Sequence, residues 1–60
     1  MKELLIEMMQ NAADSGQPVW DWHPDLVADE ILAYVDDFAE NDYDEMVAVI
    51  TEIQGERKNA

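Results

Sequence analysis

Apolar side chains recur every three or four residues along three stretches of this chain, and mostly polar and charged side chains lie between them. This period places the apolar residues of each stretch on one face of an α-helix. In the first stretch that face consists of Met1, Leu4, Leu5, Met8, Met9 and Ala12. Gly16 and Pro18 follow, and both residue types commonly end helices. The pattern therefore predicts a first helix over residues 2–13.

The second predicted helix covers residues 24–41. Pro24 suits a first turn because its missing N–H leaves no bond unmade there, and Asp25 suits the positive end of the helix dipole. The inward face is expected to contain Val27, Ile31, Tyr34, Val35 and Phe38, with Ala28 and Leu32 beside it.

The third predicted helix covers residues 42–54. Asp42 and Glu45 have the spacing of a capping box, and Gly55 suits a C-terminal cap. Its inward face is expected to contain Met46, Val49, Ile50 and Ile53, with Tyr43 and Val47 at the margins.

These elements predict an all-α fold, a small three-helix bundle forming one domain over residues 1–60. A tight turn between the second and third helices should make them antiparallel. Residues 15–23 form a loop that carries both tryptophans, and residues 56–60 are expected to fray.

Charge changes this picture from an ordinary bundle to an unusual one. The formal net charge is −12, from 15 acidic and 3 basic residues. From residue 3 to residue 56 there is no Lys or Arg, and all the carboxylates lie in that stretch. Ordinary solvated surfaces mix both signs. An apolar fraction of 48% still provides a core, so the charge does not indicate a disordered tail.

The sequence contains few of the residue patterns that catalytic, cofactor-binding or metal-binding sites require. The absence of cysteine excludes a thiol nucleophile, a disulfide and a Cys-rich zinc site. A single histidine makes a Ser-His-Asp triad unconvincing, and neither glycine builds a phosphate loop. The acidic residues 36–45 lack the spacing and central glycine of an EF-hand. We therefore expect a protein that is not an enzyme and binds no cofactor or metal.

His23 and the two tryptophans are the remaining candidates for chemistry or recognition. His23 lies between Asp21 and Asp25, which would allow a metal ligand or a proton switch, but a turn residue capping the second helix is favoured. We expect Trp20 to be buried over the end of the core. Trp22 should be partly exposed, where it could contact a partner.

One outward stripe of the second predicted helix gathers carboxylates. Asp25, Asp29, Asp36 and Glu40 fall on the same side at 3.6 residues per turn, and Asp37 widens the stripe. These five residues and Trp22 form the predicted partner-binding site.

Three uses of the charge remain open. The chain could mimic a nucleic acid and occupy the basic groove of a DNA- or RNA-binding protein; in size and charge it resembles the small acidic antagonists that phages carry against host defence or repair. It could instead be a specific protein-interaction module, such as an immunity protein, antitoxin or adaptor, using Trp22 and an acidic face. In the third, the charge only keeps a halophile-type protein soluble.

The expected partner is a basic protein, foremost a nucleic-acid-binding one. Repulsion disfavours direct contact with nucleic acid or with an anionic membrane. The N-terminal stretch lacks the features of a targeting signal, so the default location is cytoplasmic. A homodimer through a seam poor in charge stays open.

Overall fold

The computed structural model describes residues 1–59 and shows three α-helices and one short 3₁₀ helix. They are α1 (Lys2–Asp14), α2 (Pro24–Tyr34), η1 (Glu40–Asp42) and α3 (Tyr43–Lys58). No strand occurs among the described residues. The all-helical, three-helix prediction is therefore confirmed. Ala60, the last residue of the predicted frayed tail, lies outside the described residues.

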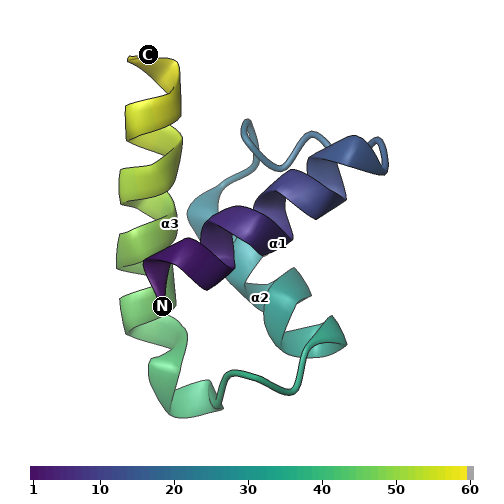
Figure 1. Cartoon of the computed structure of the whole chain (residues 1–60). Helices are drawn as coiled ribbons and strands as arrows, with labels where there is room; N and C mark the ends of the chain where they lie inside the picture. The colour runs from purple at the N-terminus through teal and green to yellow at the C-terminus, as the bar shows by residue number, and fades with distance from the viewer. Residues whose placement is uncertain (60) are drawn as a thin grey trace.

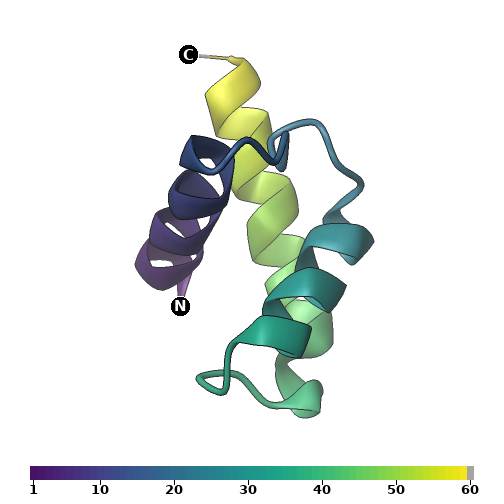
Figure 2. The ribbon, with the colours of Figure 1, turned by 90° about the vertical axis from the view of Figure 1, so that its right-hand side faces the viewer.

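α3 is the central element, against which both other helices pack (Figure 1). α1 crosses one side of α3, and α2 runs along another side in the opposite direction (Figures 1 and 2). The antiparallel arrangement of α2 and α3 thus agrees with the prediction. The second view separates α1 and α2 on either side of α3, so each helix buries its apolar face mainly against the central one.

The core is drawn from all three helices and from the loop between α1 and α2. Its buried apolar residues are Leu5, Met9, Val19, Val27, Ala28, Ile31, Met46, Ile50 and Ile53. Eight of these nine lie on or beside the predicted inward faces, and Val19 comes from the loop. Burying a side chain of this size contributes about 1.5–3 kcal/mol relative to leaving it in water, so this cluster dominates the stability of a chain without disulfides.

The first helix ends close to the predicted position. Gly16 adopts a φ of 98°, in the left-handed region, where a residue with a side chain would be strained. It directly follows Ser15, the C-cap residue of α1. The N–H of Gly16 donates to the carbonyl of Ala13, which satisfies one of the terminal acceptors of α1.

The second helix is seven residues shorter than predicted, because it ends at Tyr34 instead of residue 41. Val35 is extended, with φ −130° and ψ 132°. A continued helix would place Asp36 and Asp37 near the negative end of its dipole and Asp36 four residues before Glu40, which is a repulsive spacing. The predicted tight turn is consequently wrong, since residues 35–42 form a longer connection that includes η1.

The third helix continues four residues beyond its predicted end. Gly55 lies inside the helix instead of capping it, and α3 reaches Lys58. A glycine inside a helix costs about 1 kcal/mol relative to alanine. Arg57 and Lys58 in the last turn offset part of that cost, because they face the negative end of the dipole.

Candidate protein-binding surface

The acidic residues are concentrated in residues 21–45, which we call the acidic segment. It carries ten of the 15 carboxylates and no Lys or Arg, so its formal charge is −10. The other five carboxylates and the three cations leave only −2 for the rest of the chain. Eight of the ten side chains are exposed, and Glu30 and Asp42 are half-buried. The segment runs from the end of the tryptophan loop through α2 and the following connection to the start of α3, and its later part lies at the lower end of Figures 1 and 2.

The structure does not place the predicted acidic residues on one stripe of α2. Asp25 and Asp29 lie on that helix and are exposed. Asp36 and Asp37 lie in the connection and Glu40 lies in η1, so the predicted continuous helical face is wrong. The reason is the early end of α2, which the carboxylates themselves favour. All five side chains are nevertheless exposed within the same acidic segment.

Asp42 has a different role from the one its spacing suggested. Its side chain makes no cap bond at the start of α3; instead its Oδ2 accepts the N–H of Ala39 at 3.0 Å. This contact closes the turn that leads into η1, so the carboxylate shapes the connection.

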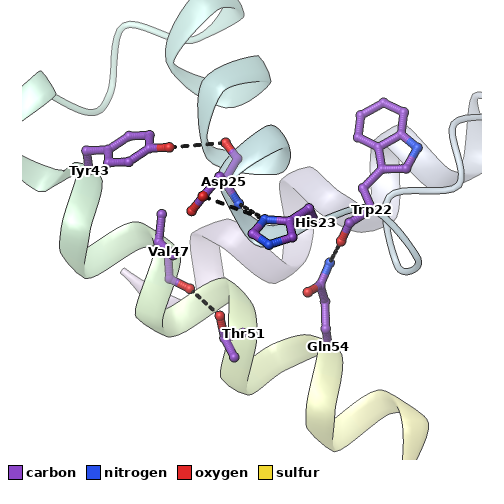
Figure 3. A network of polar contacts seen from close by, with 7 residues as sticks. All are labelled: Trp22, His23, Asp25, Tyr43, Val47, Thr51 and Gln54. Atoms are coloured by element: carbon purple, nitrogen blue, oxygen red, sulfur yellow. Dashed lines mark hydrogen bonds and ion pairs between the residues drawn. The ribbon is translucent and has the colours of Figure 1, made fainter.

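Gln54 fastens the tryptophan loop to α3 (Figure 3). Its Nε2 donates to the carbonyl oxygens of Val19 at 3.0 Å and Trp22 at 2.8 Å. Gln54 is buried, with 7% of its surface exposed, so these bonds replace contacts with water. The backbone of the loop is thereby held in one place, which positions both indole rings.

Sequence reasoning missed Gln54, although a signal was present. It lies four residues after Ile50 and next to Ile53, on the inward face of α3. A polar residue on an otherwise apolar face indicates a buried hydrogen bond.

Trp20 is half-buried and was predicted to be buried, so that prediction is wrong. The guanidinium of Arg57 lies 4.0 Å from the centre of its ring, within the range of a cation–π contact. The extension of α3 past Gly55 is what brings Arg57 over the ring. Trp22 is also half-buried, as its prediction required.

Lys2 joins the start of α1 to the last turns of α3. Its Nζ lies 3.1 Å from a carboxylate oxygen of Glu52 and also pairs with Glu56. Hydrogen bonds to Glu56 and then Glu52 raise the pKa of Lys2 above its usual 10.5. Lys2 and Arg57, two of the three basic residues, thus each contact a group from another part of the fold at one corner of the molecule.

His23 caps α2, as the favoured interpretation held. Its Nδ1 accepts the N–H of Asp25 at 3.3 Å, and Pro24 occupies the first turn (Figure 3). Nearby, the hydroxyl of Tyr43 donates to the backbone carbonyl of Asp25 at 3.5 Å. Partial burial, followed by the negative charges of Asp25, Asp29 and Asp44, raises the pKa of Tyr43 above its usual 10.0.

A groove of about 300 Å³ lies between α1 and α2. Its walls are mostly apolar and come from α1, the tryptophan loop and the inner side of α2, ending at Val35. The lining residues are Met8, Met9, Asn11, Ala12, Gln17, Val19, Trp22, Val27, Glu30, Ile31, Tyr34 and Val35. Tyr34 was predicted to face the core, but 81% of its surface is exposed. Because it is the last residue of the shortened α2, its ring extends past the core and lines the groove.

The described residues hold no cluster of three or more His, Cys, Asp or Glu side chains arranged to bind a metal ion. In the same part of the chain, no helix has the length and apolar character needed to cross a bilayer. The acidic segment and the apolar groove are the most distinctive surface features of the described residues.

Comparisons of the chain with protein-family models, with curated proteins and with solved structures gave no significant match.

Proposed function

We propose that this protein is a small acidic binding protein that occupies and blocks a basic protein surface, of the kind that otherwise holds a nucleic acid. The observation that carries the proposal is the segregation of charge: residues 21–45 hold ten carboxylates, eight of them exposed, without a single Lys or Arg. Such a surface repels nucleic acid and attracts the proteins that bind it.

The dimensions support the comparison with a nucleic acid. The longest axis of the molecule is 30 Å, so its 15 carboxylates correspond to roughly one charge per 2 Å. Duplex DNA carries one charge per about 1.7 Å of axis when both strands are counted. A groove lined with Lys and Arg, which neutralises the phosphates of DNA, would therefore meet a similar density of negative charge on this chain.

The test is capture of partners on tagged protein from a bacterial lysate, at low and high salt and with or without competing duplex DNA. We expect the tagged protein to capture a nucleic-acid-binding protein, and both high salt and competing DNA should release it. Labelled DNA bound to that purified partner should then be displaced by the untagged chain, as followed by fluorescence anisotropy. Partners indifferent to salt and DNA would contradict the proposal, and capture of nothing would favour a solubilising role for the charge.

Two matched variants separate local charge from net charge. One replaces Asp29→Asn, Asp36→Asn and Glu40→Gln in the acidic segment. The other replaces Glu3→Gln, Glu7→Gln and Asp14→Asn on α1. All six side chains are exposed, and each variant removes three negative charges. The first should weaken DNA displacement about tenfold or more, and the second much less. Equal loss would show that only total charge matters.

A second function is favoured by the groove. An apolar groove lined by Trp22 and by the exposed Tyr34 is typical of an interaction module whose affinity comes from aromatic hot spots, as in an immunity protein, antitoxin or adaptor. In that case a captured partner should withstand high salt, and Trp22→Ala should weaken it more than the acidic-segment variant does.

A further inference from the structure

The groove exists because α1 and α2 both pack mainly on α3 and make little contact with each other. Met8 and Ala12 on one side and Ile31 and Val35 on the other remain only partly covered or lie at the edge of the core. A volume of about 300 Å³ is at the lower end of the range for ligand pockets, about 300–1,000 Å³. The groove therefore has room for a few side chains.

Two aromatic rings with different surroundings line this groove. The backbone of Trp22 is held by Gln54, whereas Tyr34 at the end of α2 is 81% exposed. Aromatic side chains bury large apolar areas and are enriched at binding hot spots, so this pair is well suited to contact an inserted apolar group. Met8 beside them adds an unbranched side chain that adapts to different shapes.

The charges around the groove select its occupant. Among the described residues that line it, Glu30 alone carries a formal charge, and it is half-buried. The lining ends at Val35, directly before Asp36 and Asp37 in the chain. A Lys or Arg beside an inserted apolar side chain would therefore meet carboxylates. A second copy of this chain would instead bring a net charge of −12 toward the same surface.

We propose that the groove between α1 and α2 docks a basic amphipathic helix of the partner, with its apolar side chains inserted between Trp22 and Tyr34 and its Lys or Arg side chains facing Glu30 and the other carboxylates of the acidic segment. This inference rests on the proposed function, since it takes the partner to be basic, and it adds the apolar anchor. In helix-in-groove recognition an amphipathic helix lays its apolar face into a hydrophobic groove, and complementary charges beside the groove add specificity and speed association.

The probe is a synthetic helical peptide of about 18 Leu and Lys residues with separate apolar and basic faces. A Lys homopeptide of equal charge and a Leu–Gln peptide with the same apolar face serve as comparisons. Binding to the full ¹⁵N-labelled chain is followed by NMR. The indole N–H of Trp22 should shift on addition of the Leu–Lys peptide, and that of Trp20, which lies outside the groove lining, serves as an internal reference.

The decisive variant is Tyr34→Ala, with Leu26→Ala as its matched control. Both side chains are exposed apolar residues of α2, at 81% and 45%, but only Tyr34 lines the groove. Because Tyr34 is largely in water, its truncation should leave the fold intact, which the NMR spectrum itself checks. Tyr34→Ala should weaken the Leu–Lys peptide about tenfold, and Leu26→Ala should leave its affinity unchanged.

Each other outcome has a distinct meaning. Equal binding of the Leu–Lys peptide and the Lys homopeptide, without a shift at Trp22, would overturn the groove proposal and leave the proposed function standing. Failure of both cationic peptides to bind would overturn both. Equal binding of the Leu–Gln peptide would refute a basic occupant. Shifts at the groove that grow with protein concentration alone would identify the occupant as a second copy.

Discussion

Two regions of this small bundle handle charge in opposite ways. At the corner where α1 begins and α3 ends, Lys2 pairs with Glu52 and Glu56, and Arg57 covers Trp20. In the acidic segment, ten carboxylates lie on a connected stretch with no cation in its sequence. At the corner each of these cations contacts a group on another part of the fold, whereas the acidic segment has no Lys or Arg to offset its charge.

The difference shows where the fold can tolerate repulsion. The corner joins elements that are distant in sequence, with 50 residues separating Lys2 from Glu52, and Gln54 fastens the tryptophan loop nearby. The acidic segment spans the end of the tryptophan loop, α2, a connection and the start of α3. These elements are anchored in the core by buried apolar residues such as Val27, Ile31 and Met46. Apart from Asp42, which closes the turn into η1, most carboxylates of the acidic segment are exposed to solvent, which is the physical reason to look for their role in binding.

The largest expected effect lies in the fastened region, at Gln54. Gln54→Leu keeps a helix-forming residue of similar size but leaves the carbonyls of Val19 and Trp22 without their donor. An unpaired buried polar group costs about 1–3 kcal/mol, so urea unfolding should show a loss of about 2–4 kcal/mol. The total free energy of unfolding of a chain of this length is roughly 3–9 kcal/mol, so the variant should be close to unfolding.

The matched control is Gln10→Leu on α1, whose amide bonds the exposed carboxylate of Asp14. It should change the free energy of unfolding by less than about 0.5 kcal/mol. Equal losses in the two glutamine variants would mean that the tryptophan loop is held mainly by Val19 and the indole rings.

A smaller effect is expected when repulsion in the acidic segment is relieved. Raising NaCl from about 10 to 150 mM should increase the melting temperature of the wild type, because screening shortens the range of repulsion. The Asp29→Asn, Asp36→Asn, Glu40→Gln variant should melt about 2–4 °C higher than wild type at low salt and respond less to salt.

The melting temperature of the Glu3→Gln, Glu7→Gln, Asp14→Asn variant should rise less. Glu3 lies in the first turn of α1, where its negative charge interacts favourably with the helix dipole, and this variant loses that interaction. Thermal melts followed by circular dichroism measure both variants. If the two gained equally, the contrast between the regions would reflect net charge alone.

The smallest effect is expected at alkaline pH, where each region contains one group with a raised pKa. The folded state holds the protons of Tyr43 and Lys2 more tightly than the unfolded state does. Their contributions to stability are complete below their usual pKa values of 10.0 and 10.5, and they are lost as pH rises through the higher folded values.

The denaturant midpoint should therefore fall as pH rises from about 9 to 12. In the Tyr43→Phe and Lys2→Gln variants this decrease should be smaller than in the wild type, because each variant lacks one of the two titrating groups. Tyr34→Phe removes a phenol away from the Tyr43 contact and is the control. A midpoint that rises with pH in this range would contradict the assignment of both groups.

Much of the fold could be predicted from the apolar pattern. The three-residue and four-residue spacing identified all three helices, the antiparallel α2–α3 pair, and eight of the nine buried apolar residues. His23 before Pro24 similarly indicated the cap of α2. These features depend on neighbours in the sequence, where helix period and capping rules operate.

The candidate site was predicted less well. Continuing the helical period through residue 41 placed Asp36, Asp37 and Glu40 on α2, whereas the helix stops at Tyr34. The same error hid the exposure of Tyr34 and therefore the groove. Helix ends depend on a balance between dipole, repulsion and packing, and the period of the apolar residues carries no information on the first two.

The sequence by itself determined the helical class, the core and the separation of charge, because periodicity and composition are properties of the chain alone. Only the tertiary structure decided that α3 continues through Gly55, since Lys2 and Arg57 find their partners across the fold. It also decided that Gln54 holds the tryptophan loop and that α1 and α2 leave a groove between them. Contacts between residues distant in the chain produce these features, and no local rule contains them.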